Sequence, residues 1–160
     1  MAQSMITING RRFPFRKGQT VLEVGCGTGF FTRPAAKMIG ESGKLIAMDP
    51  VEGFVDAVGR KAQAGGLENI EVVRRDALKS ALDTASIDVV LLFGVIPFPT
   101  LPLGRLLPEM HRVLKTQGTM AVWLFPTTAG VPTAIRRSGL FIELGRKNGV
   151  FLYRRSDKTR

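Results

Sequence analysis

Short apolar runs alternate along the chain with helix-like segments from residue 20 onward. Runs rich in Val, Ile and Leu predict strands covered on both faces at residues 20–24, 44–48, 69–75, 87–93 and 119–125. Helices are predicted at about residues 30–39, 53–64 and 103–115, with a short one near 132–138. This alternation is typical of a parallel sheet built from strand–helix–strand units.

Two Asn-Gly pairs between strand-like runs predict hairpins. Asn148-Gly149 separates residues 140–144 from 150–154, so the sheet is expected to end with an antiparallel strand. Asn9-Gly10 separates residues 6–8 from 11–13 and predicts a small hairpin ahead of the main fold. The pattern as a whole predicts an α/β fold: a doubly wound sheet of seven strands, mostly parallel, with one antiparallel strand near the C-terminus.

The 160 residues have room for one domain with a substantial core. We expect a core over residues 18–155, an N-terminal extension over 1–17 and a frayed tail over 156–160. The sequence has no membrane-length apolar run and no secretory signal. A single cysteine, Cys26, cannot form an internal disulfide, which fits a cytoplasmic location.

The formal net charge of +10 is the unusual bulk property of the chain. Such a protein attracts anions, among them nucleic acid and acidic partners. A basic surface that is simply solvated explains the charge equally well, so nucleic acid remains a possible partner and no more.

A glycine-rich turn follows the first predicted strand, in the run Val24-Gly25-Cys26-Gly27-Thr28-Gly29. Glycines permit positive φ angles and let a ligand approach the backbone closely. In open α/β sheets, ligands bind beyond the carboxyl ends of the strands, which is where this turn is expected to lie.

Three acids distinguish this turn from a dinucleotide site. Glu23, Asp49 and Asp76 each fall at the end of a predicted strand, so strand direction brings them to one edge of the sheet. A pyrophosphate there would face like charge, and Gly-x-Gly-x-Gly departs from the dinucleotide spacing. S-adenosylmethionine has no phosphate and carries an ammonium and a sulfonium, which an acidic rim stabilises.

With these features the chain resembles the class I, Rossmann-like S-adenosylmethionine-dependent methyltransferases, in particular the group that includes ubiquinone and menaquinone biosynthesis and type 11 enzymes. The resemblance covers residues 18–126 and rests on residues 21–29, 43–50, 76–77, 87–90 and 112–118. It implies S-adenosylmethionine as cofactor and these binding residues: Glu23, Val24, Gly25, Cys26, Gly27, Gly29, Asp49, Pro50, Val51, Asp76, Ala77, Phe93 and Gly94.

The resemblance also implies a role for most of these residues. The glycines line the methionine part of the cofactor, with Glu23 near its ammonium. Asp49 accepts hydrogen bonds from the two ribose hydroxyls, and Pro50 and Val51 pack on adenine. Asp76 meets the adenine amino group together with the Ala77 backbone, while Phe93 and Gly94 border the reacting methyl group.

The sequence disfavours several methyl acceptors. Residues 94–98 lack the side-chain acceptor that exocyclic base amines need, and Cys26 sits in the turn, where it cannot serve as a cytosine or arsenic nucleophile. No acid lies between Asp88 and Glu109 to hold a metal for catechol chemistry. His111, the single histidine, is expected on the helix half away from the cofactor, so we predict no catalytic side chain and no metal ligand.

We therefore predict methyl transfer to an oxygen, nitrogen or carbon of a small molecule. Phe98 is a candidate cover for an apolar acceptor, and the predicted hairpin tip with Arg146 and Lys147 is a candidate attractor of an anionic one; simple packing and solvation explain them equally well. Relatives usually carry N-terminal helices and an insertion after the fifth strand; here about twenty residues precede the first predicted strand, and residues 126–131 are expected to form a short connection. An RNA or protein methyltransferase, a noncatalytic cofactor-binding subunit completed by a partner, and a homodimer remain alternatives.

Overall fold

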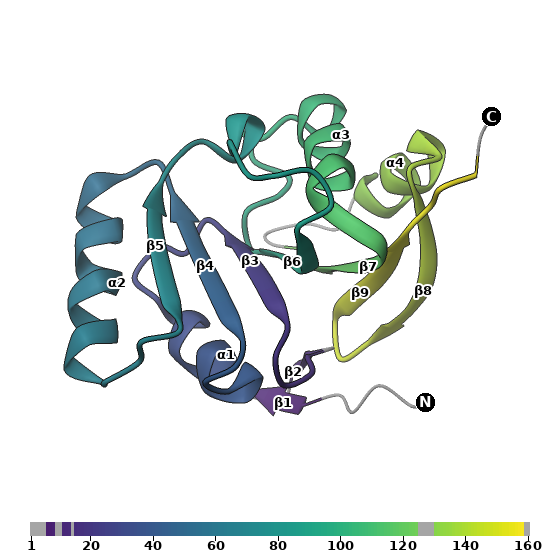
Figure 1. The fold of residues 1–160 in the computed structure, drawn as a ribbon. Helices are drawn as coiled ribbons and strands as arrows, with labels where there is room; N and C mark the ends of the chain where they lie inside the picture. Colours follow the sequence, from purple (N-terminus) through teal and green to yellow (C-terminus); the bar gives the residue numbers. More distant parts are fainter. Residues whose placement is uncertain (1–5, 9–10, 14, 125–129, 159–160) are drawn as a thin grey trace.

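The computed structural model describes residues 6–8, 11–13, 15–124 and 130–158 of the chain. Figure 1 shows a central twisted sheet with helices packed on both of its faces. In chain order the main fold comprises β3 (Thr20–Val24), α1 (Thr32–Ile39), β4 (Lys44–Asp49), α2 (Glu52–Ala64), β5 (Ile70–Arg74), the 3₁₀ turn η1 (Ala77–Lys79), β6 (Ile87–Phe93), α3 (Leu103–Val113), β7 (Leu114–Trp123), α4 (Val131–Ser138), β8 (Phe141–Lys147) and β9 (Val150–Arg155).

The sheet has seven strands in the order β5-β4-β3-β6-β7-β9-β8. Strands β5 to β7 pair in parallel, and β9 runs antiparallel to both β7 and β8. The strand order reverses beside β3, because β3 pairs with β4 on one side and with β6 on the other. The predicted mixed sheet with one antiparallel strand near the C-terminus is confirmed.

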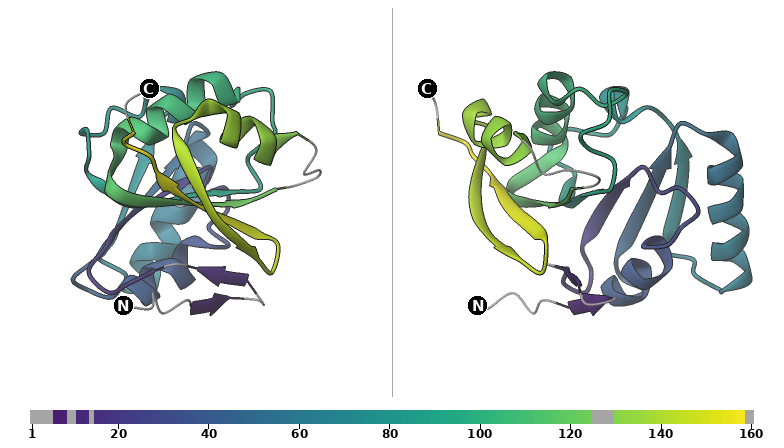
Figure 2. Two further views of the ribbon diagram at one scale, coloured as in Figure 1. Left: turned by 90° about the vertical axis from the view of Figure 1, so that its right-hand side faces the viewer. Right: turned by 180° about the vertical axis from the view of Figure 1, so that it is seen from behind.

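The core is divided by the sheet into two layers. One layer packs α3 and α4 on side chains such as Leu22, Val90 and Met120. The other packs α1 on the alternate residues of the same strands, among them Val21 and Val89. Figure 2 shows α3 and α4 on one side of the sheet and α1 on the other. Side chains that alternate in direction along each strand therefore supply both layers.

The N-terminal segment pairs as predicted, with β1 (Ile6–Ile8) antiparallel to β2 (Arg11–Phe13) in a separate two-stranded sheet. The Asn9-Gly10 pair lies outside the described residues. Phe15 is fully buried in the layer that contains α1. Phe15, which falls within the predicted N-terminal extension, therefore contributes to the core.

The C-terminal segment is held at Ser156. Its backbone N–H donates to the Leu140 carbonyl at 2.9 Å, and its carbonyl lies 2.8 Å from His111 Nε2. Both backbone polar groups of Ser156, the first residue of the predicted tail, are therefore bonded. Among the described helices, none is both long and apolar enough to span a membrane.

Strand β7 differs most from its predicted bounds, because it begins at Leu114, directly after α3, rather than at residue 119. Lys115, Thr116 and Gln117 in its first half are exposed and polar, so no apolar run marks them in the sequence. Gln117 has a φ of 69°, and the pairing register shifts between Ile87 and Val89 opposite this stretch. The predicted end at Phe125 lies outside the described residues.

Candidate functional site

A cavity of about 490 Å³ opens at the carboxyl ends of β3, β4, β5 and β6. The strand order reverses at this edge, which is where open α/β sheets bind their ligands. The cavity is lined by Val24, Gly25, Met48, Asp49, Pro50, Arg75, Asp76, Ala77, Gly94, Val95, Phe98, Thr100 and Leu101. Two carboxylates therefore share the cavity with an apolar wall.

The glycine loop uses its backbone donors within the protein. The N–H groups of Gly25 and Cys26 both donate to the Met48 carbonyl, at 2.8 and 3.1 Å, and that of Gly29 donates to the Cys26 carbonyl at 2.9 Å. A phosphate-binding loop instead points such donors at the anion. These three donors are unavailable to a phosphate, which fits the absence of phosphate from the predicted ligand.

Asp49 connects the glycine loop to the end of β4. Its Oδ2 accepts the Gly27 N–H at 3.1 Å, and its Oδ1 accepts the Val51 N–H at 2.9 Å. Each carboxylate oxygen has a second lone-pair direction. Asp49 is buried yet lines the cavity, so it can accept two more hydrogen bonds from a ligand there.

Gly25 shapes the cavity wall nearest to β6. Its φ is 70°, a left-handed conformation that side chains disfavour. A Cβ atom at this position would lie 2.4 Å from Val95 Cγ1. The chain can therefore bring the loop and the residues after β6 close together only with glycine here.

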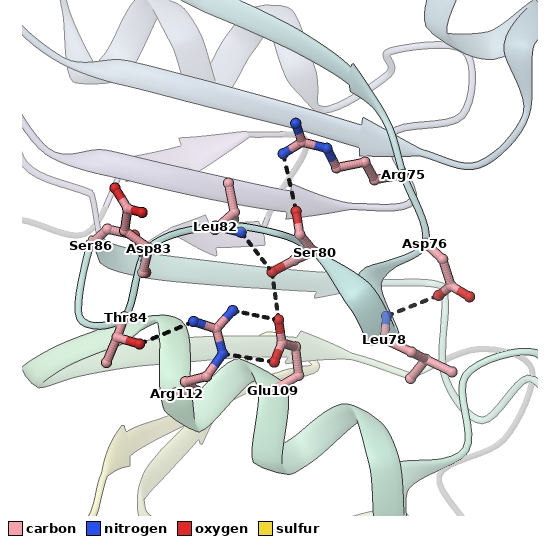
Figure 3. A network of polar contacts seen from close by, with 10 residues as sticks. All are labelled: Arg75, Asp76, Leu78, Ser80, Leu82, Asp83, Thr84, Ser86, Glu109 and Arg112. Carbon is pink, nitrogen blue, oxygen red and sulfur yellow. Dashed lines mark hydrogen bonds and ion pairs between the residues drawn. The ribbon is translucent and has the colours of Figure 1, made fainter.

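Asp76 lines the same cavity from the segment that follows β5. Its Oδ1 accepts the Leu78 N–H at 2.9 Å and so caps η1. Figure 3 shows the Asp76 carboxylate beside Leu78 at the start of η1, and α3 packs against this turn. Asp49 and Asp76 thus lie at the carboxyl ends of the neighbouring strands β4 and β5, at one edge of the sheet.

Glu23 lies beneath the loop and is absent from the cavity lining. It is 3% exposed, and the Thr32 hydroxyl at the start of α1 donates to its Oε1 at 2.5 Å. Burial, with a smaller contribution from the charge of Asp49, raises the pKa of Glu23 from 4.5 to about 7 against the lowering effect of the Thr32 hydrogen bond. The predicted contact of Glu23 with the cofactor ammonium stays a prediction.

The remaining predicted residues divide between the cavity and its surroundings. Those that line it are Val24, Gly25, Asp49, Pro50, Asp76, Ala77 and Gly94. Those that lie outside its lining are Glu23, Cys26, Gly27, Gly29, Val51 and Phe93. Phe93 is buried with its ring edge-to-face on Phe31, at 5.2 Å between centroids, and Val51 is exposed at the start of α2.

Sequence reasoning left out five residues of the cavity wall: Met48, Arg75, Val95, Thr100 and Leu101. Met48 directly precedes Asp49, and Arg75 directly precedes Asp76. Their position next to predicted site residues could have identified them from the sequence. Val95, Thr100 and Leu101 belong to the irregular segment after β6, whose path no periodic pattern reveals. Phe98, the candidate cover, does line the cavity.

Cys26 is buried within the loop. Burial, together with the negative charges of Glu23 and Asp49, raises the pKa of its thiol from 9.0 to about 12. The thiol therefore stays protonated at neutral pH and is a poor nucleophile.

His111 lies on α3, where its ring bonds the Ser156 carbonyl and packs edge-to-face on Phe141. It is absent from the cavity lining, as expected. A larger hollow, of about 910 Å³, lies at the amino ends of β4 and β5 and is lined by charges of both signs, including the Lys44–Glu71 ion pair. It is remote from the loop between β3 and α1, so the smaller cavity is the candidate site.

The fold and the glycine loop between β3 and α1 are typical of the class I S-adenosylmethionine-dependent methyltransferases. Residues 21–118 match the model of a family described as methyltransferase domain, and the chain belongs to this family. S-adenosylmethionine is the cofactor of these proteins, as the sequence predicted.

Three proteins illustrate the similarity. The demethylmenaquinone methyltransferase of Geobacillus stearothermophilus is 33% identical over 109 residues, which are 68% of this chain and 46% of that protein. Protein-L-isoaspartate O-methyltransferase 2 of Archaeoglobus fulgidus is 28% identical over 123 residues, 77% of this chain and 56% of that protein. A solved S-adenosylmethionine-dependent methyltransferase from Aquifex aeolicus is 29% identical with a TM-score of 0.74, over 87% of this chain and 82% of that one. The chain spans about half the length of the curated relatives it matches.

Proposed function

We propose that the protein transfers a methyl group from S-adenosylmethionine to an oxygen, nitrogen or carbon atom of a small molecule. The observation that carries the proposal is the combination of two carboxylates, Asp49 and Asp76, with a glycine loop whose donors are bonded internally. This combination favours a cation that brings its own hydrogen-bond donors and disfavours a phosphate.

The residues present fit the cofactor. Asp49 offers the lone pairs that a ribose diol needs, and Asp76 offers a carboxylate oxygen for the adenine amino group. Pro50 lines the cavity between them and, with the exposed Val51, gives adenine an apolar surface. Gly25 and Val24 leave room for the methionine part, with Gly94 across from them.

The cofactor supplies an electrophilic methyl group on a sulfonium, so the protein's contribution is to hold an acceptor in line with that methyl group. Positioning of this kind can account for a large share of a methyl transfer rate. The wall after β6 brings Val95, Phe98 and Leu101 to the cavity beside Gly94. This wall can exclude water and orient an apolar acceptor by contact.

The acceptor class that this wall favours is an apolar or aromatic ring. Phe98 is exposed and lines the cavity, so its ring can cover a bound molecule. A quinone-type acceptor, as in the name of the Geobacillus relative, has these properties. We therefore place the acceptor against Phe98 and Leu101.

A second candidate function, methylation of RNA or protein, is favoured by a basic groove between α1 and α2. This groove, of about 570 Å³, is lined by Arg33, Lys37 and Lys61 and by Phe30, which is 61% exposed. Within the described part of the chain, neither Arg33 nor Lys37 forms an ion pair. Cations beside an exposed aromatic ring suit a single-stranded nucleic acid.

The test is transfer of labelled methyl groups from S-adenosylmethionine to three acceptor pools offered separately: a demethylated quinone mixture, bulk RNA and isoaspartyl peptide. We expect label in the small molecules and loss of that label in Phe98→Ala. Label in RNA, with Arg33→Ala/Lys37→Ala abolishing it, would assign the second candidate instead. Cofactor binding without transfer to any pool would point to a noncatalytic subunit that a partner or a second copy completes.

A further inference from the structure

The segment between β5 and β6 carries two cavity residues, Asp76 and Ala77, on an irregular path. Over residues 75–86 its one regular element is the single turn η1. Ala81 and Ala85 have φ angles of 55° and 54°, conformations that cost alanine about 1 kcal/mol or more each. Contacts from elsewhere in the molecule must therefore hold this segment in place.

Ser80 supplies the first of these contacts. It is 0% exposed, and its hydroxyl donates to Glu109 Oε1 at 2.7 Å and accepts the Leu82 N–H at 3.3 Å. Its carbonyl accepts from Arg75 Nη1 at 3.1 Å. Figure 3 shows Ser80 between Arg75 and Glu109, directly after the turn that Asp76 caps.

Glu109 on α3 is held in turn by Arg112. The guanidinium donates from Nε to Oε2 at 2.9 Å and from Nη2 to Oε1 at 2.7 Å, and its Nη1 reaches the Thr84 hydroxyl at 3.1 Å. The Arg112 carbonyl also accepts the Ala85 N–H at 3.0 Å. The bidentate pair fixes the carboxylate in one orientation.

These hydrogen bonds lower the pKa of Glu109, with the Arg112 side chain the largest cause and Ser80 a further one, to about 2. The carboxylate is therefore ionised throughout the neutral range. An ionised acceptor makes the bond from Ser80 stronger than one between neutral groups.

We propose that Glu109 is a positioning residue for recognition of the adenine base: through Ser80 it fixes η1, and η1 fixes the Asp76 carboxylate at the cavity. The inference rests on the proposed function, because it assigns Asp76 to the adenine amino group. Glu109 itself does not line the cavity, so it acts through Asp76.

The experiment compares two ligands in each variant by calorimetry: S-adenosylhomocysteine and S-inosylhomocysteine, whose base carries a carbonyl in place of the amino group. In the wild type, Asp76 accepts from the amino group, and we expect the inosyl ligand to bind about tenfold or more weakly. The quantity to compare is the ratio of the two dissociation constants, inosyl ligand over adenosyl ligand. In Glu109→Gln we expect this ratio to fall several-fold, toward equal binding. The folded fraction cancels in the ratio, so loss of stability alone leaves it unchanged.

The matched control is Glu143→Gln, the same substitution in the Arg136–Glu143 ion pair between α4 and β8, away from the cavity. Its ratio should equal that of the wild type. Ser80→Ala serves as a second variant, since it breaks the same connection without leaving Arg112 beside an amide, and it should lower the ratio as well.

Three results would overturn the inference. A wild-type ratio near one would contradict the contact between Asp76 and the amino group. A ratio unchanged from the wild type in both Glu109→Gln and Ser80→Ala would contradict the positioning role of Glu109 and leave the proposed function intact. A wild type that binds neither ligand would overturn the proposed function together with the inference.

Discussion

Glu23 is buried beneath the glycine loop, where its pKa is raised from 4.5 to about 7. Between these values the unfolded chain loses the proton while the folded chain keeps it. The contribution of the protonated carboxyl to the free energy of unfolding is therefore fully present below pH 4.5 and is lost as the pH rises through 7. The free energy of unfolding falls by roughly 3 kcal/mol at most over this range. Denaturant unfolding at pH 5 and pH 8 should show this fall in the wild type.

The control for this prediction is Glu23→Gln, which keeps an acceptor for Thr32 and cannot ionise. Its free energy of unfolding should change less than that of the wild type over the same pH range. An equal change in both proteins would show that Glu23 is not the group responsible.

Cys26 should resist modification in the folded protein. Its thiol is buried and its pKa is raised to about 12, so less than about 1 in 1,000 molecules is a thiolate at pH 8. We expect a thiol reagent at pH 8 to label Cys26 slowly in native buffer and rapidly in denaturant. Rapid native labelling that S-adenosylhomocysteine does not slow would contradict the buried loop conformation.

At the scale of residues, the sequence predicted acids at strand ends, and two of them, Asp49 and Asp76, do line one cavity. The third, Glu23, is absent from the lining, and its carboxylate accepts a hydrogen bond from Thr32, nine positions later. This hydrogen bond depends on how α1 packs beneath the loop, which no local pattern encodes. The same holds for Glu109, because its contact with Ser80 joins positions 29 residues apart.

Strand β9 contains a buried polar group, the Tyr153 hydroxyl, that has no hydrogen-bond partner among the residues that the structure describes. Tyr153 is 0% exposed, in the layer between the sheet and α4. A buried hydroxyl without a partner is destabilising, so Tyr153→Phe should raise the free energy of unfolding by about 1 kcal/mol. Denaturant unfolding measures this change, and a loss of stability would imply that the hydroxyl has a partner such as bound water.

At the scale of elements, periodicity and turn chemistry predicted the helices and strands of the main sheet in their order along the chain. The bounds failed where tertiary structure overrides local pattern. Strand β7 begins at Leu114, which pairs with Ile87 of β6, and includes the exposed Lys115 and Thr116. Phe15 belongs to the core although polar residues follow it. Propensity cannot report either of these contacts.

At the scale of the whole molecule, the β8–β9 hairpin brings positive charge to the cofactor edge of the sheet. Val150 pairs with Trp123 at the carboxyl end of β7, so the tip with Arg146 and Lys147 projects at that edge. The Arg146 guanidinium lies 4.8 Å from the centre of the Phe151 ring. Part of the net charge of +10 thus lies at the carboxyl edge of the sheet.

If this tip steers an anionic acceptor, Arg146→Ala/Lys147→Ala should lower kcat/KM several-fold at low salt and little at high salt. The control is Arg136→Ala/Arg137→Ala on α4, which removes equal charge away from the carboxyl edge. An equal fall of kcat/KM in both variants would assign the effect to net charge. No fall in either variant would show that the tip does not steer the acceptor.

The central claim is that the cavity between Asp49 and Asp76 binds S-adenosylmethionine. Calorimetric titration with S-adenosylhomocysteine tests it most directly, with NAD as the comparison ligand and Asp49→Asn as the variant. We predict micromolar binding by the folded wild type, about tenfold or greater weakening in Asp49→Asn, and no measurable affinity for NAD. Tighter binding of NAD, or equal binding of S-adenosylhomocysteine by wild type and Asp49→Asn, would contradict the account.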